Sequence, residues 1–132
     1  MPVWLDVSDV IYFHRETLDE HGGLPGLPDQ GALESTITRP RNPVVYHEEA
    51  TIFQLAAAYG FGFARNHCFP DGNKRLALIS IDVFLQINGH ELVAEEADAV
   101  LTIQEVASGD LTESDLAAWI AENSIPFDLN AR

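Results

Sequence analysis

The stretch HCFPDGNKRLALISIDVFL, residues 67–85, decides the fold of this 132-residue chain. Its first part contains Pro70 and Gly72, which interrupt helix, and its second part is almost continuously apolar. A helix that is apolar nearly all round is typical of a protein interior, and we predict this one from Gly72 or Asn73 to Asn88. The sequence therefore predicts a tight loop that leads directly into the central buried helix.

Apolar residues at helical spacing recur on both sides of this stretch. The clearest case is a second buried-face helix predicted over residues 48–64. Further helices are predicted at 7–21, 29–39, 95–108 and 112–123, with a short extended piece at 90–94. No longer alternating strand pattern is present, so we predict an all-α fold of about six helices, in a single domain over residues 1–132.

The composition excludes several classes of partner. The formal net charge is -14, and direct binding to nucleic acid or to an anionic membrane requires clustered positive charge, so we expect neither. The single cysteine, Cys68, cannot form an internal disulfide, which fits a reducing compartment. With no apolar run long enough for a bilayer and no opening signal segment, the sequence indicates a cytoplasmic protein.

The few basic residues are unevenly placed. Of the seven Lys and Arg residues, Arg65, Lys74 and Arg75 lie within eleven positions, and Lys74 is the only lysine. A local positive site in an acidic molecule indicates a small anionic ligand. The first turn of the helix after Gly72 has free backbone N–H groups, and a helix N-terminus next to a glycine is a ready phosphate site. Side chains of Asn73, Lys74 and Arg75 add further donors.

Two other residues of this segment have chemistry suited to phosphate transfer. His67 can act as a general base near neutral pH, and Asp71 is an oxygen ligand suited to Mg²⁺ bound to phosphates. A base, a metal ligand and a phosphate cradle together indicate a phosphate-transfer site. Taken singly, His67 is also consistent with a structural loop histidine, Asp71 with a helix cap, and Arg65 with a cation that stabilises a helix C-terminus.

The string from His67 to Arg75 resembles the signature of Fic-domain proteins, His-x-Phe-x-Asp/Glu-Gly-Asn-Gly-Arg-x-x-Arg. Two positions depart: Lys74 replaces the second glycine, and Leu78 replaces the final arginine. Both departures resemble the Doc ("death on curing") branch of the Fic/Doc superfamily, which reads Asn-Lys-Arg here. The resemblance extends over nearly the whole chain, through His21–Asp29, the Arg39–Pro40 pair and the Asn88–Gly89 pair.

This resemblance implies the Fic/Doc fold and an enzyme that uses ATP with Mg²⁺. Fic enzymes typically transfer AMP to a protein hydroxyl, with the motif histidine, here His67, as the base. The Doc branch is understood to bind the nucleotide reversed and to transfer the terminal phosphate to a threonine of elongation factor Tu. It is also paired with a Phd-like antitoxin. The alternatives are AMP transfer, against which Lys74 and Leu78 argue, and a non-catalytic binding protein, against which His67, Asp71 and Asn73 argue.

Overall fold

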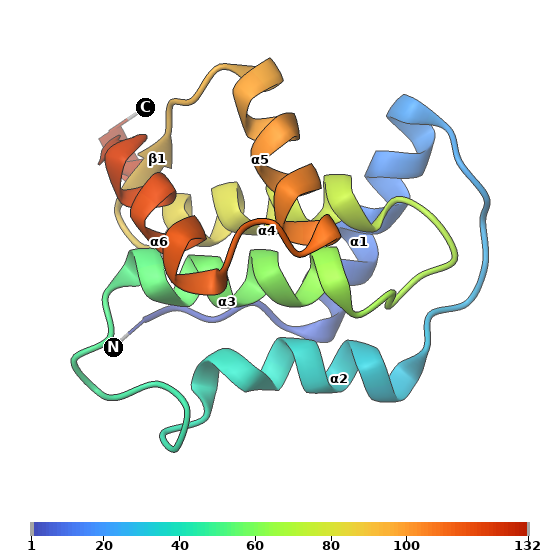
Figure 1. Ribbon diagram of the computed structural model, residues 1–132, viewed down its shortest axis with the longest axis horizontal. Coiled ribbons are helices and arrows are strands. Elements are labelled where there is room, and N and C mark those ends of the chain that lie inside the picture. The colour runs from blue at the N-terminus through green and yellow to red at the C-terminus, as the bar shows by residue number, and fades with distance from the viewer. Residues whose placement is uncertain (1, 132) are drawn as a thin grey trace.

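A computed structural model describes residues 2–131 as a predominantly helical protein (Figure 1). The six α-helices are α1 (Val7–His21), α2 (Gln30–Thr38), α3 (Ile52–Arg65), α4 (Asn73–Ile87), α5 (Glu96–Ser108) and α6 (Glu113–Glu122). Two 3₁₀ turns, η1 (Arg39–Arg41) and η2 (Leu129–Ala131), and two short strands, β1 (His90–Leu92) and β2 (Ser124–Pro126), complete the described chain. The predicted all-α class with six helices is confirmed.

Helix α3 shares the centre of the fold with α4, the helix after Gly72 that the sequence predicted, and α4 contacts α1, α3, α5 and β1. Helix α3 contacts α2, α4, α5 and α6, and nine of its fourteen residues are buried. Helix α4 packs along α3 with six of its fifteen residues buried, while Leu78, Ile79 and Val83 remain half-buried (Figure 1). The alanines and glycines of α3 let neighbouring helices approach from several sides, and apolar content alone does not report how many neighbours a helix has.

Helix α3 also begins later than predicted, at Ile52 and not at Glu48. Thr51 and Gln54 form a reciprocal capping box, in which the Thr51 hydroxyl accepts from the Gln54 N–H and the Gln54 side chain accepts from the Thr51 N–H, at 3.1 and 2.8 Å. Residues 42–50 form turns. The capping box gives hydrogen-bond acceptors to two backbone N–H groups at the start of α3. The helix can therefore begin at Ile52 without an earlier helical turn to supply those acceptors.

The two strands form one short antiparallel pair near the C-terminal end of α4. His90 lies opposite Pro126 and Leu92 opposite Ser124. The predicted extended piece at 90–94 is confirmed for its first three residues. Its partner β2 was missed because three residues are too few for an alternating pattern to be recognised.

Within residues 2–131, no helix combines the length and the apolar character needed to cross a lipid bilayer.

Candidate active site

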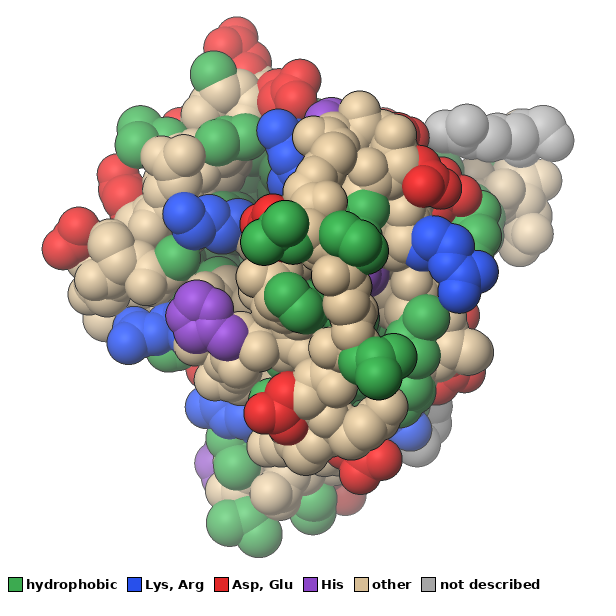
Figure 2. All heavy atoms as spheres, turned by 90° about the vertical axis from the view of Figure 1, so that its right-hand side faces the viewer, with side chains coloured by type: hydrophobic (Ala, Val, Ile, Leu, Met, Phe, Trp, Pro, Cys, Tyr) green, Lys and Arg blue, Asp and Glu red, His purple; other side chains and the backbone are tan. Residues whose placement is uncertain are grey.

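The loop between α3 and α4 lies at one end of the molecule, beside the connection from α1 to α2 (Figure 1). Figure 2 looks at this end and shows several Lys and Arg side chains near a histidine, with apolar side chains between them. A pocket of about 480 Å³ opens here. Its walls come from the loop, from both helices that the loop joins and from α5: Ala64, His67, Pro70, Asp71, Gly72, Asn73, Lys74, Gln104, Ala107 and Ser108.

His67 lies in this pocket in a strained backbone conformation. Its φ of 47° is the only positive φ of a non-glycine residue in the described chain, and its side chain is exposed. Left-handed backbone at a non-glycine residue costs on the order of 1 kcal/mol and is concentrated at functional sites. His67 lines the pocket, and a histidine there can act as a general base.

The floor of the pocket is the uncapped N-terminus of α4. Gly72 occupies the cap position with φ 81°, and no side chain accepts a hydrogen bond from the first turn. Within the described chain, the first backbone bond of this helix runs from the Leu76 N–H to the Gly72 carbonyl, at 3.0 Å. The N–H groups of the preceding turn are therefore available to an anion, as the sequence predicted.

The side chain of Asn73 binds the loop, and Asn73 also lines the pocket. Its Nδ2 donates to the Phe69 carbonyl at 2.8 Å, and its Oδ1 accepts from the Phe69 N–H at 3.1 Å. The sequence predicted this side chain as a phosphate donor, and an amide nitrogen that donates one hydrogen bond keeps a second N–H. Its backbone N–H, in the first turn of α4, is a further donor that Asn73 can offer to a phosphate.

Asp71 ties the loop to the connection that follows α1. Its Oδ2 accepts from the Leu24 N–H at 3.0 Å and its Oδ1 from the Gly72 N–H at 2.9 Å. These two hydrogen bonds lower the pKa of the Asp71 carboxyl below its ordinary value, and the bond from Leu24 has the larger effect. The alternative in which Asp71 caps α4 is wrong, because Gly72 holds that position.

A metal ion would need more than Asp71. Among residues 2–131, no cluster of three or more His, Cys, Asp or Glu side chains could hold a metal. Mg²⁺ is commonly bound by one or two carboxylates together with substrate phosphates and water, and a carboxylate oxygen that accepts one N–H bond retains a second lone pair. Asp71 therefore fits Mg²⁺ only when a phosphate completes the coordination.

The predicted basic residues divide into two groups. Lys74 lines the pocket, whereas Arg65 and Arg75 are exposed and are not among its lining residues. The Arg65 guanidinium lies over the Phe61 ring, 5.3 Å from its centroid. Arg65 thus packs along the end of α3, and its Nη1 would lie 3.8 Å from a Cβ at Gly109, the residue after the pocket-lining Ser108.

A buried histidine of α1, which the sequence analysis did not select, contacts the loop directly. His14 Nε2 donates to the Asp71 carbonyl at 2.8 Å, and its ring stacks on Phe69 with centroids 3.7 Å apart. Its position on the buried face of α1, four residues after Val10, is the sequence signal that could have found it.

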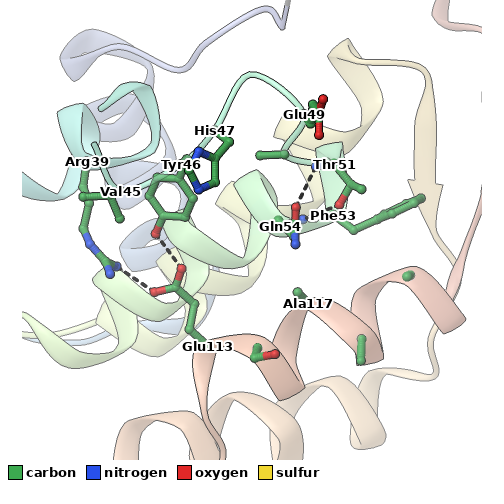
Figure 3. Close-up of a pocket in the computed structure, with 14 residues that line it drawn as sticks. Arg39, Val45, Tyr46, His47, Glu49, Thr51, Phe53, Gln54, Glu113 and Ala117 are labelled. Atoms are coloured by element: carbon green, nitrogen blue, oxygen red, sulfur yellow. Dashed lines mark hydrogen bonds and ion pairs between the residues drawn. The ribbon is translucent and has the colours of Figure 1, made fainter. Parts of the chain in front are cut away.

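A larger pocket of about 870 Å³ lies elsewhere, between residues 45–54 and α6 (Figure 3). It shares no lining residue with the pocket around His67. At one end Glu113 accepts from Arg39 Nη1 at 2.7 Å and from the Tyr46 hydroxyl at 2.5 Å (Figure 3). The N-termini of α3 and α6 lie at this pocket, but the Thr51 and Thr112 side chains cap them, so neither is an open anion site like the N-terminus of α4. Its size alone therefore does not make this pocket the centre of chemistry.

Comparisons with known proteins identify the family. The model of the Fic/DOC family matches residues 4–85, which include the loop and most of α4. The chain is 37% identical over 110 residues to the "Protein kinase doc" of Escherichia phage P1, covering 83% of this chain and 86% of that protein. It is 38% identical over 125 residues to the "Toxin Doc" of Mycolicibacterium smegmatis, covering 92% and 93%. On these matches and on the motif geometry, the chain belongs to the Fic/DOC family.

Proposed function

We propose that this protein is a Doc-like toxin that transfers the terminal phosphate of ATP to a Ser or Thr hydroxyl of a target protein, elongation factor Tu. The observation that carries the proposal is the pairing of a strained, exposed His67 with the uncapped N-terminus of α4 and Lys74 in one pocket. A base beside an anion cradle is what phosphoryl transfer requires. The names of the two relatives, a protein kinase and a toxin, support the same proposal.

In this reaction His67 accepts the proton of the target hydroxyl as the hydroxyl oxygen attacks the γ-phosphorus. The bond between that phosphorus and the bridging oxygen breaks, and ADP leaves with the bonding electrons. The free N–H groups of the first turn of α4 and the Lys74 ammonium stabilise the negative charge that develops on the phosphates. Arg65 and Arg75, at the margin of the site, would assist through longer-range charge.

Mg²⁺ would be held by Asp71 together with the phosphates, and when bound it neutralises charge on the phosphate oxygens. The part of Asp71 itself is to present a carboxylate that stays ionised, since its backbone hydrogen bonds lower its pKa.

Two alternatives predict different outcomes. In an AMP transferase the α-phosphate would be attacked, but Lys74 and Leu78 depart from the residues of that pattern, and Leu78 is half-buried in α4. A non-catalytic binding protein would have no need of a base beside a phosphate cradle.

As a toxin, the protein would act in the cytoplasm, where translation takes place, and a Phd-like antitoxin would restrain it. A disordered antitoxin segment that folds into a helix on the toxin is the mode of binding we propose.

Paired labelling tests the proposed reaction. Purified protein, Mg²⁺ and elongation factor Tu are incubated with ATP labelled at either the α- or the γ-phosphate, and the factor is analysed for label. We expect label from γ only. His67→Ala should reduce the rate by roughly 10²- to 10⁴-fold, the usual contribution of a general base. His21→Ala, which removes an exposed histidine at the end of α1, is the matched control and should label like the wild type.

Label from the α-phosphate would contradict phosphate transfer and establish AMP transfer. Absence of label from either position, together with cell toxicity that survives His67→Ala, would favour the binding-only alternative.

A further inference from the structure

Helix α1 contacts the loop between α3 and α4 through a buried polar side chain, that of His14. His14 is 5% exposed and lies on the buried face of α1 with Val10 and Thr17. Its Nε2 is 2.8 Å from the Asp71 carbonyl oxygen, across 57 residues of sequence. A carbonyl oxygen only accepts hydrogen bonds, so the His14 ring carries its proton on Nε2.

We infer that His14 is a positioning residue, which orients the peptide unit between Asp71 and Gly72 and thereby the phosphate cradle at the start of α4. The expected effect of His14 on catalysis rests on the proposed function, whereas its effect on the loop conformation does not.

Both ends of that peptide unit are held by hydrogen bonds. The Asp71 carbonyl accepts from His14, and the Gly72 N–H donates to the Asp71 carboxylate at 2.9 Å. A peptide unit is rigid and planar, so holding its two polar ends sets the direction in which the chain enters α4. The N–H groups of the first turn follow that direction, and they are the proposed phosphate donors.

The stacked contact with Phe69 supports the same role. The two rings lie 13° from parallel with centroids 3.7 Å apart, so Phe69 fixes the plane of the His14 ring. The imidazole also lies directly beside Gly72, because a Cβ at Gly72 would be 3.4 Å from His14 Nε2, an ordinary van der Waals distance. A residue that served only to fill the core would need no hydrogen-bond donor at this position, and an apolar side chain would avoid the cost of burying polar groups.

Two substitutions of His14 separate the role of its hydrogen-bond donor from the role of its aromatic ring. His14→Phe keeps an aromatic ring on Phe69 and removes the donor, whereas His14→Gln keeps an N–H donor and removes the ring. His21→Gln, on the same helix but exposed and in contact with Glu20, is the control.

The first readout is the backbone amide and imidazole NMR spectrum of the whole protein, which needs no activity. We expect the wild-type His14 ring to carry its proton on Nε2, and His14→Phe to shift the amide signals of Phe69 and of residues 71–75. His14→Gln should shift them less, and His21→Gln should leave them in place. A proton on Nδ1 of His14 in the wild type, or loop signals unmoved in His14→Phe, would overturn the inference.

The second readout is the labelling rate of folded protein. We expect His14→Phe to lower kcat by about ten- to a hundredfold, the effect of a small misplacement of reacting groups, and His14→Gln to restore most of the loss. An unchanged kcat in His14→Phe would overturn the inference. If the wild type transfers no label, the proposed function fails, while the NMR result still decides the position of the loop. If His14→Phe fails to fold, the inference is tested by the tautomer of His14 in the wild type and by the loop amide signals of His14→Gln.

Discussion

The contact between α3 and α4 allows a quantitative test at Gly60, a buried residue in the middle of α3. A Cβ built at Gly60 would overlap Ile81 Cδ1, lie 2.8 Å from Ile81 Cγ1 and 3.4 Å from Leu116 Cδ2. Ile81 and Leu116 are fully buried, so neither has free space to move into. Gly60→Ala therefore forces α4 and α6 outward or Ile81 out of its rotamer.

The magnitude follows from two opposed terms. Alanine gains about 1 kcal/mol over glycine in a helix interior. Overpacking of a well-packed core costs about 1–3 kcal/mol, and the contact with two atoms of Ile81 places this case at the upper end. We expect Gly60→Ala to lower the free energy of unfolding by about 2 kcal/mol net, measured by urea denaturation followed with far-UV circular dichroism.

Gly31→Ala is the matched control, because the nearest atom to a Cβ there is Asp29 Oδ1 at 3.6 Å. It should leave stability unchanged or raise it by up to about 1 kcal/mol. Ile81→Val, which removes the overlapping Cδ1 and alone costs about 0.5–1.5 kcal/mol, should be less costly in the Gly60→Ala background. A Gly60→Ala protein as stable as the wild type, or strict additivity with Ile81→Val, would refute this account of the helix contact.

Two further predictions concern buried titratable groups. Burial raises the pKa of the Cys68 thiol, which is inaccessible to solvent. A thiol reagent at pH 8 should therefore modify the urea-unfolded chain fully and leave the native protein unmodified. Rapid labelling of the native protein would contradict this prediction. Burial also raises the pKa of Asp82, whose Oδ1 lacks a hydrogen-bond partner among the described residues. The folded carboxyl then binds its proton more tightly than the unfolded one, so stability falls as pH rises above about 4, and Asp82→Asn should raise the Tm at pH 7 by a few degrees but not at pH 4. An equal gain at both pH values would contradict the assignment.

Most of the helices and the core of the site could be predicted from the sequence, because the signals are local. Pro70 and Gly72 interrupt helix wherever they occur, and the apolar spacing of 73–87 indicates a buried helix without knowledge of its neighbours. The pocket residues from His67 to Lys74 lie close together in the sequence, so the chain itself brings them together.

The central place of α3 could not be predicted in this way. Helices α3 and α4 both have extensive apolar surface, and only their packing shows that α3 is the more deeply buried of the two. The role of Asn73 was also beyond the sequence, because an amide at a helix start can bind either a ligand or the backbone of its own loop. In the folded chain it binds Phe69.

The sequence by itself determined the helical class, the turn at 70–72 and the set of chemical groups from His67 to Lys74, since each depends on residues close together in the chain. Tertiary structure alone decided what surrounds that set: the α5 wall at Gln104 and Ser108, the Leu24 N–H on Asp71, and His14 on the Asp71 carbonyl. These groups come from distant parts of the sequence. Their proximity is a result of helix packing, which places side chains according to the whole core and not according to local order.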